Sequence, residues 1–171
     1  MGEIGLDTKL DPDGPDSPDL ATQLAVLRPQ LELADDLGLP VILHCRGAFE
    51  ELLDELARFG GRLRGVLHAW SRGPELAERF VGAGMALGLG GAVTRPTARR
   101  VRRTAQRLPL ENFVLETDAP SIGLDGVLPE DTEPAHLADV AAALASLRDE
   151  SIETIAEVTT SHAERLFNLP A

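Results

Sequence analysis

The chain has 171 residues, of which 43% are hydrophobic and 26% are charged. This length and composition exclude a disordered or fibrous protein and predict a single globular domain over residues 1–171. The 16 basic and 28 acidic residues leave a net charge of −12, which argues against any function that needs the whole surface to attract nucleic acid or an anionic membrane.

The single cysteine, Cys45, excludes a disulfide framework and a zinc ribbon built from paired cysteines. No apolar run approaches the roughly 18 to 20 residues of a membrane-spanning helix, and the acidic N-terminus lacks the features of a signal peptide. We therefore expect a cytoplasmic protein with no membrane partner.

Short apolar runs alternate with helical patterns along the first two thirds of the chain. The runs are continuously apolar, as strands buried on both faces should be, and they predict five parallel strands at 2–6, 40–45, 65–69, 85–89 and 113–116. The segment 7–19, which follows the first run, carries five aspartates and three prolines and predicts a polar loop.

Helical patterns separate these runs and fill the last third of the chain. The first helix is expected over 17–36, opening at Ser17 and bending or breaking at Pro29. A short last helix is expected from Ser161, which has capping-box spacing with Glu164. The other helices are expected at 48–59, 74–81, 96–108, 133–147 and 151–158. This order predicts an α/β fold with right-handed crossovers and a parallel sheet that is either open or part of a barrel.

Metal-ligand residue types stand at the carboxyl ends of four of the five predicted strands, where function sits in parallel α/β proteins. Mixtures of histidine and carboxylate suit divalent first-row metals, and burying such charges in a sheet is costly unless they are paired or coordinated. The fourth strand ends in glycines, which let a substrate approach the backbone closely. The strand-end residues are Glu3, His44 and His68, then Gly88, Gly90 and Gly91, and finally Glu116 running into Asp118.

These residues lie within a series of ordered motifs that resembles the TatD-related deoxyribonucleases of the amidohydrolase-like superfamily. The resemblance covers essentially the whole chain. The motifs are GEIGLD at 2–7, LPVILHCR at 39–46, VLHAWS at 66–71, GLGG at 88–91, LETDAPS at 115–121, Glu-Pro at 133–134 and AERLF at 163–167.

The resemblance implies a metal-dependent hydrolase of phosphodiester bonds in DNA, built on a TIM-like (β/α) barrel. It implies that Glu3 bridges two metal ions and that His44 and His68 hold one of them. It also implies that Asp118 binds the other ion, orients the attacking water and is the candidate general base. The catalytic residues expected are thus Asp118 and Glu3, and the cofactor expected is one or two divalent ions, Mg²⁺, Mn²⁺ or Zn²⁺.

The chain departs from the family at the first barrel strand, which carries a His-x-His pair in the family and is absent here. The remaining histidines, His136 and His162, fall in predicted C-terminal helices. Five strands also fall short of the eight in a barrel of about 250 residues, so we expect a partial barrel. Three explanations stay open: the gene product begins upstream of Met1, another chain, such as a second copy, completes the sheet, or the chain is a remnant. Without the pair, a single-metal site through Glu3, His44, His68 and Asp118 is expected.

Two arginines beside the predicted ligands are candidates for binding the substrate phosphate. Arg46 directly follows His44, and Arg72 stands near His68 where the family usually has glycine. A further arginine stripe, spaced four residues apart at 95, 99, 103 and 107, is expected to be a solvated helix face. The segment 129–131 carries acids where the family tends to place bases.

Three functional readings therefore remain. The family resemblance favours a nuclease that acts on DNA by metal-activated water. The ligand set alone fits equally a metallohydrolase of another ester or amide, which the net charge of −12 favours. The third reading is a non-catalytic remnant or subunit.

Overall fold

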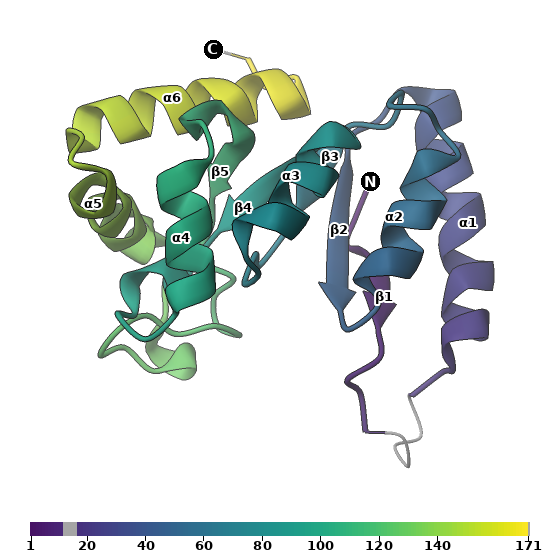
Figure 1. Ribbon diagram of the computed structural model, residues 1–171, viewed down its shortest axis with the longest axis horizontal. Coiled ribbons are helices and arrows are strands. Elements are labelled where there is room, and N and C mark those ends of the chain that lie inside the picture. The colour runs from purple at the N-terminus through teal and green to yellow at the C-terminus, as the bar shows by residue number, and fades with distance from the viewer. Residues whose placement is uncertain (12–16, 171) are drawn as a thin grey trace.

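The computed structural model describes residues 1–11 and 17–170, and these form one parallel sheet surrounded by helices (Figure 1). The strand order is β1-β2-β3-β4-β5, so each strand pairs with its neighbour in sequence. The predicted α/β architecture of five parallel strands is confirmed. The strands are β1 (Ile4–Asp7), β2 (Val41–Arg46), β3 (Gly65–Leu67), β4 (Met85–Leu89) and β5 (Phe113–Leu115).

The helices follow one another from the β1 edge of the sheet toward the β5 edge (Figure 1). The α-helices are α1 (Leu20–Leu37), α2 (Phe49–Ala57), α3 (Pro74–Gly82), α4 (Arg99–Arg107), α5 (Leu137–Arg148) and α6 (Ile152–Phe167). Short 3-10 helices join them: η1 (Gly91–Thr94), η2 (Leu110–Asn112), η3 (Pro129–Asp131) and η4 (Pro134–His136). In the described part of the chain, none of these helices is both long and apolar enough to cross a membrane.

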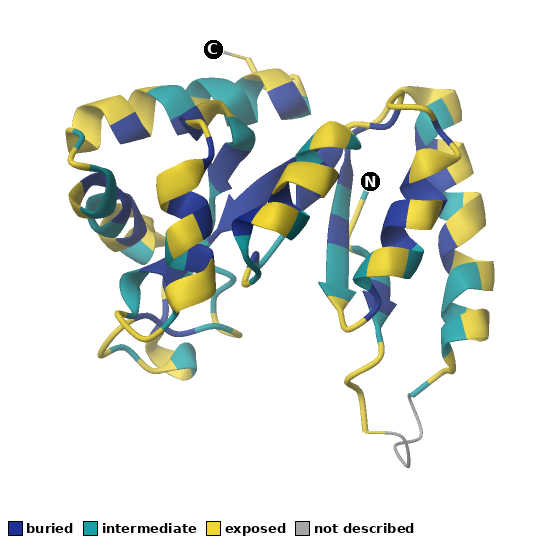
Figure 2. Cartoon of the chain, in the orientation of Figure 1, coloured by how far each residue is buried: buried dark blue, intermediate teal, exposed yellow. Residues whose placement is uncertain are grey.

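Each strand sends alternate side chains to opposite faces of the sheet. Leu43, Leu67 and Leu87 are aligned by the strand register and are buried in the main core, which the helices cover. Figure 2 shows β3, β4 and β5 mostly in the dark blue of buried residues, β2 mostly in the teal of intermediate ones, and the helices with exposed yellow outer surfaces. The main core therefore lies between one face of the sheet and the helices.

The opposite face of the sheet has an apolar layer and a polar layer. Val66 pairs with Ala86 in register, and both contact Val114 in a second buried cluster. Leu166 of α6 completes this cluster, so the last helix packs on this face. Residues two positions further along each strand point to the same face but lie nearer its carboxyl end, and those residues are polar or glycine.

The first helix differs from its prediction at its start and in its middle. Its N-cap is Asp19 rather than Ser17, and the Asp19 side chain accepts a hydrogen bond from the amide of Thr22. Asp19 is the N-cap because its carboxylate reaches this free backbone amide, and aspartate commonly caps helices in this way. Pro29 lies inside a continuous helix, so the predicted break there is wrong.

The last two predicted helices form one. Helix α6 runs without interruption from Ile152 to Phe167, so the predicted new start at Ser161 is wrong. Its N-cap is Ser151, whose hydroxyl accepts from the amide of Thr154, and Ser161 is an interior residue. A serine and a glutamate three residues apart can cap a helix only where the chain enters it, and here the chain is already helical.

The polar loop expected over 7–19 is partly strand and partly outside the described residues. Asp7 is the last residue of β1, where it pairs with Arg46 across the sheet register. The middle of the loop, residues 12–16, is not among the described residues. Asp19 at the other end belongs to the start of α1, as described above.

Candidate metal-binding site

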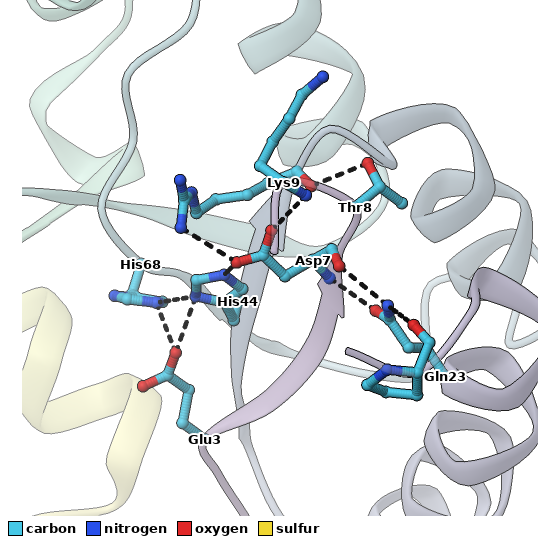
Figure 3. Close-up of polar contacts among 9 residues, drawn as sticks. Glu3, Asp7, Thr8, Lys9, Gln23, His44 and His68 are labelled. Carbon is cyan, nitrogen blue, oxygen red and sulfur yellow. Dashed lines mark hydrogen bonds and ion pairs between the residues drawn. The ribbon is translucent and has the colours of Figure 1, made fainter. Parts of the chain in front are cut away.

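Three predicted ligands, from the chain segments around β1, β2 and β3, meet in one place (Figure 3). A carboxylate oxygen of Glu3 lies 3.0 Å from Nδ1 of His44 and 2.8 Å from Nε2 of His68. The two imidazole nitrogens are themselves 3.0 Å apart. His44 lies on β2 and His68 directly follows β3, but Glu3 comes just before β1, so the expectation that it stands at the carboxyl end of its strand is wrong. Its side chain reaches the two histidines from the start of β1.

This group of two nitrogens and one oxygen fits a divalent metal ion. The three ligand atoms lie within 4.8 Å of one another, and the side chains of His44 and His68 are 28% and 10% exposed. Two imidazoles and a carboxylate are ligands that Zn²⁺, Mn²⁺ and similar ions accept, and three protein ligands leave room for water or substrate. Among the described residues, this is the only group of histidine, cysteine and acidic side chains packed this closely.

Asp7 contacts the far side of the His44 ring, and the sequence analysis did not identify it as a site residue. Its carboxylate lies 3.2 Å from Nε2 of His44, on the side of the ring away from Glu3. A carboxylate on the second nitrogen of a ligating histidine fixes the ring and its tautomer, and it makes the first nitrogen a better ligand. Gln23 of α1 holds the backbone of Asp7 through hydrogen bonds of 2.7 and 2.9 Å. Asp7 is therefore held in place by the fold.

Glu116 is a partly buried acidic residue that lines the same cavity as His68. The residue follows β5, and its carboxylate accepts a hydrogen bond of 2.5 Å from the amide of Ala69. Ala69 adopts a left-handed backbone conformation with φ of 51°, which ends β3 earlier than the sequence predicts. Burial raises the pKa of the Glu116 carboxyl above its usual value, although the bond from Ala69 acts in the opposite direction. Glu116 thus fixes the turn that carries His68.

Gly88 leaves the space that the Glu116 carboxylate occupies, so Gly88→Ala is expected to disturb the site. An added β-carbon would lie 2.7 Å from the carboxyl carbon of Glu116. The carboxylate can rotate away only by giving up its bond to the Ala69 amide, which costs about 1–3 kcal/mol. We expect urea unfolding to show that loss, together with weaker Mn²⁺ binding because the turn carrying His68 loses its anchor.

A double-mutant cycle checks the cause of this effect. In a Glu116→Ala background, the atoms that the new methyl group would overlap are gone. Gly88→Ala should then cost less than about 1 kcal/mol beyond Glu116→Ala alone. An equal cost in both backgrounds would show that the methyl group acts elsewhere.

Asp118 lies in the same cavity without joining the close group of three ligands. The cavity has a volume of about 790 Å³, and Glu3, His44, His68 and Asp118 all line it. Asp118 has φ of 55°, and its backbone carbonyl accepts hydrogen bonds from the amides of Ser121 and Ile122. The backbone carbonyl of Asp118 is therefore used within the turn, and the Asp118 carboxylate remains available to the cavity.

Both predicted phosphate-binding arginines line this cavity. Arg46 shares the Asp7 carboxylate with His44, at 3.2 Å, and its side chain is 58% exposed. The guanidinium of Arg72 lies over the ring of Phe49, 4.8 Å from the ring centre. Its Nε is shielded from solvent, and no residue in the described part of the chain accepts a hydrogen bond from it. Arg72 thus brings a positive charge to the cavity, although its Nε itself is buried.

Other reactive side chains are excluded from the chemistry by their surroundings. Cys45 lines the cavity, but burial raises the pKa of its thiol to about 12, so it is not a nucleophilic thiolate at neutral pH. His136 accepts a hydrogen bond from the amide of Glu133, and His162 bonds the carbonyl of Phe113. Both histidines lie in the C-terminal part, as predicted, and neither lines the cavity.

One protein-family profile matches nearly the whole chain. The sequence profile described as TatD related DNase matches residues 1–168. The chain belongs to this family. The membership expected from the ordered motifs is confirmed, and the family's matched region includes all the residues of the cavity.

Two curated relatives are similar over nearly the whole chain. The uncharacterized metal-dependent hydrolase YjjV of Escherichia coli K12 is 39% identical over 170 residues, which cover 99% of this chain and 64% of YjjV. The 3'-5' ssDNA/RNA exonuclease TatD of Erwinia billingiae is 32% identical over 182 residues, which cover 100% of this chain and 66% of that protein. The chain therefore spans less than two thirds of the length of each TatD-family relative.

Solved structures of the TatD family share the fold. The crystal structure of YjjV superposes with a TM-score of 0.88 at 39% identity, covering 99% of this chain and 63% of YjjV. A TatD-family hydrolase of Entamoeba histolytica superposes with a TM-score of 0.82 at 20% identity, again over 99% of this chain and 63% of that one. The predicted relation to the TIM-like barrel is therefore confirmed.

Proposed function

We propose that this TatD-family chain takes part in metal-dependent hydrolysis of phosphodiester bonds in DNA. The observation that carries the proposal is the meeting of Glu3, His44 and His68 within a cavity that Arg46 and Arg72 also line. Metal ligands and cationic groups on one cavity wall suit an anionic ester whose hydrolysis needs activated water. The family profile and the nuclease name of the Erwinia relative support this choice of bond.

The residues of the cavity have different roles in the proposed reaction. A divalent ion held by Glu3, His44 and His68 would supply Lewis-acid activation of water and charge neutralisation of the phosphate. We assign to Asp118 the role of general base, which accepts the proton of the attacking water. Asp118 can also serve as a ligand to a second ion, as the family resemblance implies. We assign Mn²⁺, Zn²⁺ or Mg²⁺ to the site.

The arginines bind and orient the substrate in this proposal. Arg72 is held over Phe49 and donates from the end of its guanidinium group to a phosphate oxygen. Arg46 reaches the cavity while it contacts Asp7, so it adds positive charge beside His44. Charge-assisted hydrogen bonds of this kind are about twice as strong as neutral ones and fix a phosphate in place.

Hydrolysis of a different ester is the second candidate, favoured by the net charge of −12 and the acidic helix η3 next to the cavity. One experiment separates the two. The protein is stripped with EDTA, reloaded with Mn²⁺ and offered bis(p-nitrophenyl) phosphate or p-nitrophenyl acetate. We expect Mn²⁺-dependent cleavage of the phosphodiester alone. Cleavage of the acetate alone would favour the second candidate, and cleavage of neither would favour a non-catalytic subunit.

A further inference from the structure

A second hollow opens beside the catalytic cavity. It has a volume of about 320 Å³ and shares Ser71 and Ala92 with the cavity, so the two are continuous at those residues. Its other lining residues come from the start of α4 and the turn before it: Thr97, Ala98, Arg99, Arg100 and Val101. The lining therefore contains two cations and no acid, in a chain whose net charge is −12.

Most other arginines near α4 are engaged by protein groups. Arg95 donates to the carbonyl of Gly123 at 2.5 Å, and Arg102 donates to the carbonyl of Val93 at 2.8 Å. Arg107 pairs with two glutamates of α3, at 3.2 and 2.9 Å. Of the expected stripe of four solvated arginines, the three on α4 are exposed (Arg99, Arg103 and Arg107), whereas Arg95 lies before the helix and is held by Gly123.

Arg99 and Arg100 remain exposed, and no described residue pairs with either. The first turn of α4 has no acidic residue that would neutralise them. Arginine forks with no protein partner are suited to the oxygens of a phosphate, which they bind through two parallel hydrogen bonds.

A buried hydrogen bond joins α4, which lines the hollow, to the loop that lines the cavity. Thr104 of α4 is fully buried, and its hydroxyl donates to the backbone carbonyl of Arg72 at 2.8 Å. This bond ties α4 to the loop that carries Arg72 and Ser71 into the cavity. The hollow, with its two free guanidinium groups, therefore lies beside the loop that carries Arg72 and Ser71.

We propose that Arg99 and Arg100 form a second phosphate subsite, which binds a neighbouring phosphate of a polymeric substrate while the reacting phosphodiester lies at Glu3, His44 and His68. This inference rests on the proposed function. A substrate with one phosphate occupies the cavity alone, whereas a longer strand continues past Ser71 and Ala92 into the hollow. The subsite thus gives the polymer additional affinity without changing the chemistry at the metal ligands.

The test compares Arg99→Gln/Arg100→Gln with a control of equal charge. Arg103→Gln/Arg165→Gln removes two exposed arginines that line neither the cavity nor the hollow. Fluorescence anisotropy follows the binding of an end-labelled oligothymidylate of about twelve nucleotides across a series of salt concentrations. Bis(p-nitrophenyl) phosphate hydrolysis with Mn²⁺ is measured on the same samples.

For Arg99→Gln/Arg100→Gln we expect oligothymidylate affinity to fall by roughly fivefold or more, and the slope of log affinity against log salt to fall by about 1.4 relative to wild type. Hydrolysis of bis(p-nitrophenyl) phosphate should stay at the wild-type rate. Equal oligonucleotide binding by the subsite variant and the control would overturn the subsite while leaving the proposed function intact. Absence of wild-type hydrolysis would instead overturn the proposed function, and this inference with it.

Discussion

Replacing His68 with alanine is expected to weaken Mn²⁺ binding at least about tenfold and to abolish the metal-dependent hydrolysis. His68 is the least exposed of the three grouped ligands, at 10%, and its Nε2 lies 2.8 Å from Glu3 and 3.0 Å from His44. Its removal takes away one of the three ligand atoms, so that only Glu3 and His44 remain to bind the ion. Titration calorimetry with Mn²⁺ measures the change directly.

Thermal unfolding gives a second readout of the same loss. An ion that binds only the folded chain stabilises it by about 2.7 kcal/mol at a hundredfold excess over Kd. We expect Mn²⁺ to raise the Tm of the wild type and to leave the Tm of His68→Ala nearly unchanged. His136→Ala is the matched control, because His136 bonds the amide of Glu133 outside the cavity. Equal Mn²⁺ affinity in the two variants would remove His68 from the ligand set.

The sequence predicted the core of this site because one rule applies to all the strands. In a parallel sheet, side chains two residues apart share a face, and the carboxyl ends lie at one edge. His44 and His68 meet these conditions and converge as expected, whereas Glu3 reaches them from the start of β1 and not from its carboxyl end. Their roles as ligands stay predictions, and so does the role of Asp118, which lines the cavity apart from the group.

Asp7 shows where composition misled the sequence reading. The segment from Asp7 to Asp19 is rich in aspartate and proline, and the composition of the segment as a whole led to the prediction that Asp7 lies in the loop. The structure places it in β1, paired with Arg46 of β2. The rule that selected His44 would have selected Asp7 as well, had the strand been extended by one residue. The missing information was the register between β1 and β2, which a single sequence does not contain.

The predicted helix boundaries were wrong where a local capping signal competed with tertiary packing. Ser161 and Glu164 have the spacing of a helix start, yet α6 continues through them because Ile155 before them and Leu166 after them are both buried in packed clusters. Arginine spacing indicated one solvated face, and Arg99, Arg103 and Arg107 of α4 are exposed as expected. Arg95 lies before the helix and is held by the carbonyl of Gly123, a long-range contact that has no signature in the local pattern.

Asp118→Asn is expected to lower the rate of phosphodiester hydrolysis by about 10²–10⁴-fold, the usual contribution of a general base. The substitution keeps the size of the side chain and removes its ability to take a proton. Asparagine also tolerates the left-handed backbone conformation of this residue, whose φ is 55°, so the turn is preserved. The loss should therefore appear in kcat with bis(p-nitrophenyl) phosphate, while the urea midpoint of unfolding stays near that of the wild type.

Asp149→Asn provides a control with the same substitution in the same backbone conformation. Asp149 has φ of 56° at the end of α5 and does not line the cavity. We expect this variant to keep the wild-type kcat and the wild-type stability. If the two variants hydrolysed the substrate equally fast, Asp118 would not accept the proton of the attacking water. A lower kcat in Asp118→Asn alone, at unchanged stability, would assign the loss to the carboxylate in the cavity and to no property of the turn.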